Sequence, residues 1–365
     1  MRVLVVNAGS SSLKVSAVDP DDSVVFEREI KAQGGHYRDN ELQSALREIE
    51  GIDAVGHRVV HGGAKYPASV RIDAQLVDYL ATITDLAPLH MPASLAGIAM
   101  VRTQLPRVPA VACFDTAFHA KMPPEATTYA VPSEWRSQYG IRRYGFHGFS
   151  HAYASRRAAE ILARPEAFMR TVTCHLGSGA SLAAVFGGRS VDTTMGFTPM
   201  EGLVMATRSG SIDPGLVLWL QRHAGMTEAQ LSEALDERSG LYGMAGIADM
   251  REVLRGAAAG SPQSRLALDV YLHRLRALIA AMFAAMNGAD AVVFTGGVGE
   301  NAPAVRAAAA EGLTFLGIEV DEGLNEHIEG DGDISTKDAA VRTLVVHARE
   351  DVEVAREVRR VLAES

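Results

Sequence analysis

The chain begins Met1-Arg-Val-Leu-Val-Val-Asn-Ala-Gly-Ser-Ser-Ser-Leu-Lys14-Val-Ser-Ala-Val18. An apolar run at residues 3–6 and an alternating run at residues 13–18 predict two strands of a hairpin. The small, polar residues 7–12 between them allow backbone N–H groups and hydroxyls to approach an anion, and Lys14 adds a positive charge. This stretch alone is equally typical of an ordinary serine-rich hairpin and of a phosphate-binding loop.

A second copy of this pattern favours the phosphate-binding interpretation. Residues 170–186 again run from an apolar segment through a Gly/Ser loop to another apolar segment, and Asn7 aligns with His175 and Gly9 with Gly177. Two such loops in one chain predict duplicated halves that face each other across a cleft. They are not Walker loops, because Gly-x-x-x-x-Gly-Lys-Ser/Thr is missing and a predicted strand, not a helix, follows each loop.

Composition narrows the class of protein. A length of 365 residues suits about two domains, and 47% hydrophobic with 22% charged residues is typical of a soluble globular chain. No signal peptide is expected, because a predicted strand begins within three residues and no basic segment followed by a long apolar one precedes it. No apolar run approaches the length of a membrane span, and Cys113 and Cys174 are expected to be reduced core thiols in the cytosol. A net charge of −9 disfavours nucleic acid and anionic membranes as partners, but not a small anion bound by local arginines.

The remaining sequence predicts a mixed α/β protein, because strand and helix patterns alternate. Strands are expected at residues 24–30, 52–60, 109–114, 291–295 and 341–346, and helices at 39–48, 73–85, 93–105, 151–162, 215–223, 227–238, 265–287, 302–311 and 351–363. Residues 296–301 are expected to form a loop.

Arg58 lies between His57 and His61, and Gly62 and Gly63 follow. The glycines would let the backbone come close to something small, and a guanidinium there suits a carboxylate or phosphate held by two hydrogen bonds. Two alternatives stay open: the histidines belong to the core or support a neighbouring site, or they bind a metal, although no glutamate accompanies them as in zinc hydrolases.

Four further positions are candidates for chemistry. Asp115 directly follows an apolar strand, where a carboxylate either faces a site or caps a turn. His147 lies between glycines, and Arg208 lies in a small polar loop; burial and simple surface exposure are their respective alternatives. Gly296-Gly-Val-Gly-Glu-Asn301 lacks the full dinucleotide fingerprint and fits a loop over an adenosine or ribose better. Together these features predict nucleotide-dependent phosphoryl transfer.

A series of motifs from one end of the chain to the other resembles the acetate kinase (acetokinase) family. They are Asn7-Ala-Gly-Ser-Ser-Ser-Leu-Lys14, His57-Arg-Val-Val-His-Gly-Gly63, Phe114-Asp-Thr-Ala-Phe-His119, Arg143-Tyr-Gly-Phe-His-Gly148, Asp192-Thr-Thr-Met-Gly-Phe-Thr-Pro199, Glu201-Gly-Leu-Val-Met205, Thr207-Arg-Ser-Gly210 and Phe294-Thr-Gly-Gly-Val-Gly-Glu-Asn301. The resemblance implies two duplicated ribonuclease H-like (actin-like ATPase) domains flanking a nucleotide cleft, with boundaries at 1–119 plus 352–365 and at 120–351. It also implies reversible transfer from ATP to acetate with Mg²⁺, or alternatively Mn²⁺, in a cytoplasmic homodimer.

The resemblance also implies roles for individual residues. Arg58 would hold the acetate carboxylate, and Val60, Leu89, Phe146 and Pro199 would form a small apolar pocket. Asp115, His147 and Arg208 would be catalytic, with His147 and Arg208 stabilising the transferred phosphoryl group, and Asn7 and Glu350 would help place Mg²⁺. The residues expected to contact ATP are Lys14, His175, Leu176, Gly177, Ser178, Gly179, Asp249, Met250, Arg251, Gly297, Val298, Gly299, Glu300 and Asn301.

The chain departs from the family pattern at three positions and in one segment. Ser178 and Arg349 stand where the family usually has Asn, Ser211 stands where it usually has Asp, and the region around residues 20–52 looks shortened. Because a carboxylate is already ionised at pH 7, its attack needs no general base, so Asp115 is expected to orient metal-bound water. A propionate or butyrate kinase on the same scaffold, and a non-catalytic nucleotide switch, are the alternatives.

Overall fold

The computed structural model describes residues 1–9, 12–31, 37–88 and 90–364. The chain folds into two compact units. Unit 1 contains Met1–Ala120, Phe146–Tyr153 and Arg349–Ser365, and unit 2 contains Lys121–Gly145 and Ala154–Ala348. The functional domain boundaries that the resemblance implies stay a prediction.

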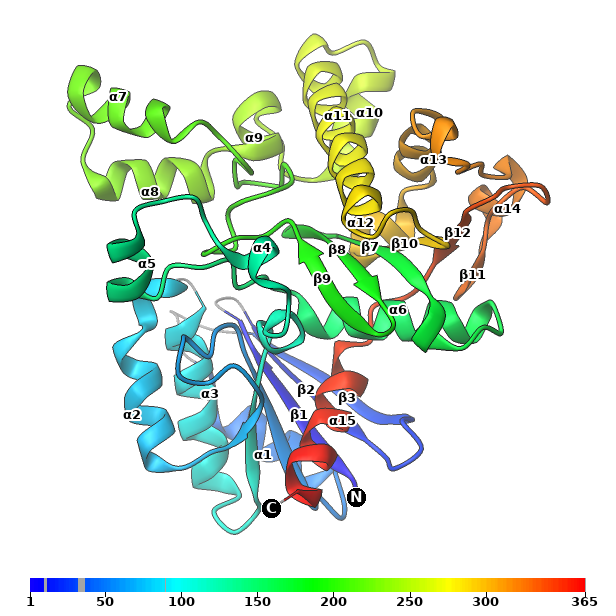
Figure 1. The fold of residues 1–365 in the computed structure, drawn as a ribbon. Helices are drawn as coiled ribbons and strands as arrows, with labels where there is room; N and C mark the ends of the chain where they lie inside the picture. Colours follow the sequence, from blue (N-terminus) through cyan, green and yellow to red (C-terminus); the bar gives the residue numbers. More distant parts are fainter. Residues whose placement is uncertain (10–11, 32–36, 89, 365) are drawn as a thin grey trace. The chain divides into compact units, whose positions relative to one another are not determined.

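Unit 1 is built on a six-stranded mixed sheet with the order β3-β2-β1-β4-β6-β5 (Figure 1). The central strands β1, β4 and β6 are parallel, and the hairpin strands β2 and β3 and the short β5 run antiparallel to their neighbours. The strands are β1 (Val3–Ala8), β2 (Ser12–Val18), β3 (Val24–Lys31), β4 (Ala54–Val59), β5 (Val70–Arg71) and β6 (Ala110–Phe114).

Helices cover both faces of this sheet. The helices α1 (Asp39–Arg47), α2 (Ala74–Thr82) and α3 (Met91–Gln104) lie on one side, where Leu4 and Val6 join a buried cluster with Val101. The alternate residues of β1, Val3 and Val5, face α15 (Glu350–Ala363) on the other side. A Cβ on Gly56 would lie 2.7 Å from side-chain atoms of Val354 and Val358, so β4 needs glycine for α15 to pack this closely.

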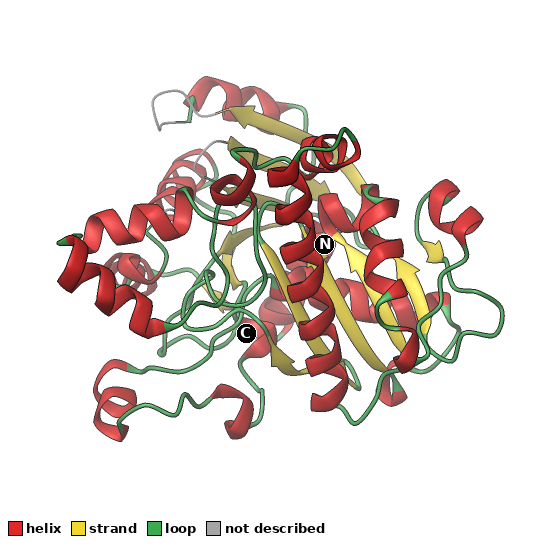
Figure 2. Cartoon of the chain, turned by 90° about the horizontal axis from the view of Figure 1, so that it is seen from above, coloured by secondary structure: helices red, strands yellow, loops and turns green. Residues whose placement is uncertain are grey.

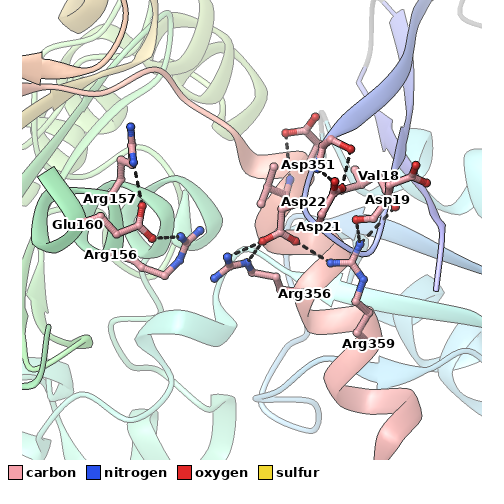
Figure 3. Close-up of polar contacts among 12 residues, drawn as sticks. Val18, Asp19, Asp21, Asp22, Arg156, Arg157, Glu160, Asp351, Arg356 and Arg359 are labelled. Carbon is pink, nitrogen blue, oxygen red and sulfur yellow. Dashed lines mark hydrogen bonds and ion pairs between the residues drawn. The ribbon is translucent and has the colours of Figure 1, made fainter. Parts of the chain in front are cut away.

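Arginines of α15 also fasten that helix to the turn between β2 and β3 (Figure 3). Arg356 and Arg359 both donate to the Asp22 carboxylate, each at 2.7 Å, and Arg359 donates to the carbonyl oxygens of Val18 and Asp19 as well. Asp22 has a φ of +67°, a left-handed conformation that Asp and Asn tolerate better than other non-glycine residues. The helix that begins at Glu350 is therefore fixed to the sheet by ion pairs as well as by apolar packing.

Unit 2 repeats the architecture. Its sheet has the order β9-β8-β7-β10-β12-β11, which matches β3-β2-β1-β4-β6-β5 strand for strand, including the antiparallel last strand. The strands are β7 (Arg170–Leu176), β8 (Ala180–Phe186), β9 (Arg189–Thr193), β10 (Ala291–Thr295), β11 (Gly332–Asp333) and β12 (Arg342–Val345). The structure thus confirms the predicted duplicated α/β fold.

The second half of the chain contains further helices (Figure 2), and only some of them pack directly on its strands. The further helices are α4 (Pro124–Thr127), α5 (Ser133–Tyr139), α6 (Gly148–Ile161), α7 (Pro214–Ala224), α8 (Glu228–Glu237), α9 (Gly240–Ala245), α10 (Met250–Ala258), α11 (Pro262–Ala285), α12 (Gly296–Asn301), α13 (Pro303–Glu311) and α14 (Glu322–His327). Among the described residues, no helix combines the length and apolarity that crossing a membrane requires.

Residues 296–301 form the short helix α12, so their prediction as a loop was wrong. Gly296 opens the turn with a φ of +77°. The Glu300 carboxylate accepts a hydrogen bond from the Gly296 N–H at 2.8 Å, and the Asn301 amide donates to the Gly297 carbonyl at 3.0 Å. These side chains stabilise helical turns in a glycine-rich segment with low intrinsic helix propensity.

Candidate active site

Four of the predicted site residues gather at one end of the unit 1 sheet. Asn7 on β1 lies opposite Arg58 on β4, and Asp115 directly follows β6. Because side chains alternate along a strand, Asn7 and Arg58 share the face of the sheet that α15 covers. Glu350 is the first residue of α15 and lies at the same end.

The Arg58 guanidinium is the centre of this cluster. Its Nε donates to Asp115 Oδ1 at 2.8 Å and its Nη2 to Asp115 Oδ2 at 2.6 Å, which is a two-pronged ion pair. Its Nη1 donates to Asn7 Oδ1 at 3.2 Å, and Glu350 Oε2 lies 3.5 Å from Nε. The Arg58 side chain is 20% exposed, whereas that of Asp115 is 2% exposed.

The electrostatics of the pair follow from its burial. Burial acts to lower the pKa of Arg58, but the carboxylates of Asp115 and Glu350 outweigh it and hold that pKa above its ordinary value. Burial raises the pKa of Asp115 to about 6, with Arg58 acting against the shift and Glu350 adding to it. Arg58 is therefore a permanent cation, and it opposes the rise that burial imposes on the pKa of Asp115.

His147 adopts a strained backbone conformation beside this cluster. Its φ is +56°, which is uncommon for a non-glycine residue and is often found at functional sites. The next residue, Gly148, donates its N–H to the Asp115 carbonyl at 3.0 Å, and a Cβ there would lie 2.2 Å from the same oxygen. The glycine thus anchors the His147 segment directly to Asp115.

The two histidines that flank Arg58 are neutral. Burial lowers the pKa of His57 to about 3, with a contribution from Arg102, and burial lowers that of His61 to about 4. His61 Nδ1 accepts a hydrogen bond from the Gly63 N–H at 2.7 Å, and its ring packs edge-on against Phe146. No cluster of three or more metal-binding side chains of the His, Cys, Asp and Glu types occurs in the part of the chain that the structure describes.

Gly62 and Gly63, which follow His61, pack tightly against other residues of unit 1. A Cβ on Gly62 would lie 2.1 Å from the Tyr66 carbonyl oxygen, and one on Gly63 would lie 2.3 Å from the Tyr79 hydroxyl. Both close approaches are therefore to neighbouring protein groups, and an approach of this backbone to a small bound group stays a prediction.

Three more residues of unit 1 were predicted to belong to the site: Lys14, Val60 and Leu89. Lys14 is exposed and lies opposite Asn7 on one side and Glu29 on the other. Val60 is half-buried and packs against a hydrophobic core cluster that includes Phe114. Leu89, like Ser10 and Ser11 of the first loop, lies outside the described residues.

Unit 2 contains a pocket of about 600 Å³ at the second Gly/Ser loop. Eight predicted residues line it: Gly177, Ser178, Asp249, Met250, Arg251, Gly297, Val298 and Asn301. Five lining residues were not predicted: Ala206, Leu241, Ala248, Tyr271 and Ala302. These five are small or apolar, so nothing in their residue type distinguishes them from core positions.

The remaining residues expected at this pocket are not part of its lining. His175, Leu176 and Gly179 belong to the hairpin around it, and Gly299 is buried against the backbone of Phe294. The Glu300 carboxylate is bonded to the backbone. Its Oε1 accepts hydrogen bonds from the N–H groups of Gly296, at 2.8 Å, and Ala348, at 2.9 Å.

Two loops of unit 2 position further predicted side chains. Asp249 caps the N-terminus of α10 through the Arg251 N–H at 2.8 Å, while the Arg251 side chain is 82% exposed. Arg208 donates from Nη1 to the Pro199 carbonyl at 3.4 Å, and its Nε lies 3.5 Å from Asp236. Burial lowers the pKa of Arg208, and Asp236 opposes the shift.

Comparison with known proteins places this fold among the small-carboxylate kinases. The chain superposes on a crystal structure of a propionate kinase from Francisella tularensis with a TM-score of 0.91 and 36% identity, covering 99% of both chains. It superposes on an acetate kinase from Porphyromonas gingivalis with a TM-score of 0.89 and 35% identity, again covering 99% of both.

Sequence relatives give the family. An acetate kinase from Gloeobacter violaceus is 45% identical over 399 residues, covering 98% of both chains. That alignment is longer than this chain, so the relative contains residues that this chain lacks. The model of the acetokinase family matches residues 27–356, and the chain belongs to that family.

Proposed function

We propose that this chain catalyses reversible phosphoryl transfer from ATP to acetate, giving ADP and acetyl phosphate. The observation that supports it best is the donor geometry at Arg58. A guanidinium has five N–H donors, and three of those on Arg58 have acceptors among the described residues. The two others are available to a carboxylate, and Asp115 holds the group that carries them in place.

The chemistry needs cations rather than a base. Acetate is ionised at pH 7, so the barrier is the approach of one anion to another, and positioned positive charge lowers it. In this proposal Arg58 binds the carboxylate, and His147 and Arg208 stabilise the phosphoryl group during transfer. Asp115 would be catalytic by holding Arg58 in place and, with the metal bound, by orienting its water.

A small apolar pocket would accept the methyl group of acetate. We assign its walls to Val60, Leu89, Phe146 and Pro199. The edge-on contact between Phe146 and the neutral His61 ring supports this assignment for Phe146, because it fixes the orientation of a side chain that is 1% exposed.

The pocket of unit 2 is proposed as the ATP site. Glycine-rich turns let the backbone come close to phosphates, and the apolar lining residues suit a purine. Ser178 offers one hydroxyl there, which donates a single hydrogen bond. The residues assigned to ATP are Lys14, His175, Leu176, Gly177, Ser178, Gly179, Asp249, Met250, Arg251, Gly297, Val298, Gly299, Glu300 and Asn301.

Mg²⁺, or Mn²⁺ in its place, is the proposed cofactor. The residues fit such an ion because Asn7, Asp115 and Glu350 bring amide and carboxylate oxygens around Arg58. Mg²⁺ commonly binds through one or two carboxylates together with substrate phosphates rather than in an all-protein cage. Asn7 and Glu350 would hold the ion, which when bound would neutralise phosphate charge.

We propose that the molecule is a cytoplasmic homodimer. The helix α7 supports an interface because none of its residues is buried, while Leu216, Leu218 and Trp219 are 46–54% exposed. Apolar side chains gathered in this way mark contact surfaces. Light scattering on the wild type and on Trp219→Asp tests the proposal, which predicts a dimer that the substitution weakens.

The deciding experiment is an assay for ADP formation with and without acetate, run with ATP, GTP and pyrophosphate as donors. Acetate-dependent ADP formation supports the proposal, and acetate-independent hydrolysis would favour a nucleotide switch. The likeness to a propionate kinase makes propionate the second candidate acceptor. If kcat/KM is higher for propionate or butyrate than for acetate, then that carboxylate, and not acetate, is the preferred acceptor.

A further inference from the structure

Three polar side chains of unit 2 form a closed cluster: Tyr129, Arg143 and Glu201. The Tyr129 hydroxyl donates to Glu201 Oε2, and Arg143 Nη2 donates to Glu201 Oε1 at 2.6 Å. The Arg143 guanidinium also lies 5.4 Å from the centroid of the Tyr129 ring, within range of a cation–π contact. Each member therefore contacts the other two.

The cluster is hydrogen-bonded to the backbone of the loop at residues 194–199, which follows β9. Arg143 Nη1 donates to the carbonyl oxygens of Thr194, at 3.1 Å, and Met195, at 3.0 Å. The Tyr129 hydroxyl oxygen accepts the Phe197 N–H at 3.0 Å. Between them, Gly196 leaves no room for a side chain, because a Cβ would lie 1.8 Å from the Glu201 carboxylate and 2.2 Å from the Tyr129 hydroxyl.

The same loop is bonded to the segment that carries Arg143. The Gly196 carbonyl accepts N–H groups from Tyr144 at 3.1 Å and Gly145 at 3.3 Å. Gly145 is the residue before Phe146, and Pro199 is three residues beyond Gly196. The cluster thus fixes the two backbone segments from which the chain continues to Phe146 and to Pro199.

The protonation of Tyr129 and the partial burial of the Arg143–Glu201 ion pair both favour lasting hydrogen bonds in this cluster. Burial raises the pKa of Tyr129, and the hydrogen bond to Glu201 raises it further, so the phenol keeps its proton and remains a donor at neutral pH. The side chain of Arg143 is 18% exposed and that of Glu201 is 34% exposed, so the ion pair is partly shielded from water.

We propose that Tyr129, Arg143 and Glu201 are positioning residues that set the size of the acetate pocket and thereby the preference for acetate over longer carboxylates. The inference rests on the proposed function, which assigns Phe146 and Pro199 to that pocket. One methylene in an apolar pocket changes kcat/KM by about 10- to 200-fold, provided that the walls do not yield. The backbone at residues 194–197, which leads to Pro199, cannot shift without breaking the hydrogen bonds to Arg143 and Tyr129.

The experiment compares kcat/KM for acetate and propionate in the wild type, Tyr129→Phe and Glu201→Gln. The matched control is Tyr144→Phe, which removes a hydroxyl from the neighbouring tyrosine whose partner is the Gly140 carbonyl. Tyr129→Phe leaves the Phe197 N–H and a Glu201 oxygen without their partner, and Glu201→Gln replaces an acceptor by a donor. The ratio of the two kcat/KM values does not depend on the fraction of folded enzyme, so a loss of stability alone leaves it unchanged.

We expect the preference for acetate to fall by about 3- to 10-fold in both cluster variants, a part of the selectivity that one methylene carries, and to stay at the wild-type value in Tyr144→Phe. Unchanged ratios in both cluster variants, or an equal fall in the control, would overturn the inference. A wild type without carboxylate-dependent ADP formation would instead contradict the proposed function.

Discussion

Replacing Arg58 by methionine tests the reasoning about the unit 1 cluster most directly. Methionine keeps an unbranched side chain but removes the charge and both hydrogen bonds to Asp115, whose side chain is 2% exposed. Removing one partner of a buried ion pair costs about 3–5 kcal/mol of unfolding free energy, because the other charge is left uncompensated. Carboxylate-dependent ADP formation should be lost, while nucleotide binding should persist.

The pH dependence of that loss gives the sharper test. Burial already raises the pKa of Asp115 to about 6, and Arg58 is the group that acts against the shift, so the pKa of Asp115 must rise further in Arg58→Met. A carboxyl whose pKa is raised in the folded state holds its proton more tightly there than in the unfolded chain. Stability therefore falls as the pH rises through the range between the unfolded-state and folded-state pKa values.

The difference in unfolding free energy between Arg58→Met and wild type should accordingly be small at pH 5 and reach its full size at pH 8. Urea unfolding at both pH values measures it. The double variant Arg58→Met/Asp115→Asn provides the control, because it removes the buried charge and should recover much of the loss at pH 8. Equal losses at both pH values, or a double variant no more stable than the single one, would refute the assignment.

Three further outcomes follow from individual contacts. Asp22→Asn keeps a residue that tolerates a φ of +67° but removes the charge that Arg356 and Arg359 share, so urea unfolding should show a loss of about 1 kcal/mol at pH 7. Burial acts to raise the pKa of Asp22 in the folded state, but the two arginines outweigh it and lower that pKa, so the loss should begin to shrink below about pH 4 and vanish only once the pH has passed the lower folded-state pKa. Tyr271→Phe removes a buried hydroxyl that lacks a partner among the described residues, so its unfolding free energy should match the wild type or exceed it by up to about 1 kcal/mol, and a clear loss would contradict this. Arg208→Ala should lower kcat by about 10³-fold in steady-state assays, and a change confined to KM would count against its proposed role.

The sequence predicted the duplicated fold because its central strands are long, apolar and joined by similar loops. The Gly9 N–H donates to the Ser12 carbonyl in the first hairpin, and the Gly177 N–H donates to the Gly179 carbonyl in the second. Two-residue strands such as β5 and β11 carry no periodic signal and were not predicted. The helix α12 was missed because its stability comes from the contacts of Glu300 and Asn301 and not from residue propensity.

The site was predictable in parts for a similar reason. Arg58 and Asp115 come at or directly after strands, and the ends of neighbouring parallel strands meet at one edge of a sheet. Glu350 came only from the family resemblance, since nothing local relates a residue at the start of the last helix to Arg58. The cluster of Tyr129, Arg143 and Glu201 escaped prediction because hydrogen bonds across 58 and 72 positions of sequence leave no pattern in it.

The two sheets have matching strand orders, but different residues occupy equivalent positions at their ends. Because Asn7 and His175 occupy equivalent positions in their hairpins, the strand pairings make Arg58 equivalent to Thr295, and Asp115 equivalent to Ala348. The ion pair of unit 1 is therefore replaced in unit 2 by a hydroxyl and a methyl group. After β10 the chain enters α12, whose Gly297, Val298 and Asn301 line the pocket of unit 2. The same register thus places the Arg58–Asp115 ion pair at the end of one sheet, while the pocket at the end of the other takes its charged side chains, Asp249 and Arg251, from the segment at α10.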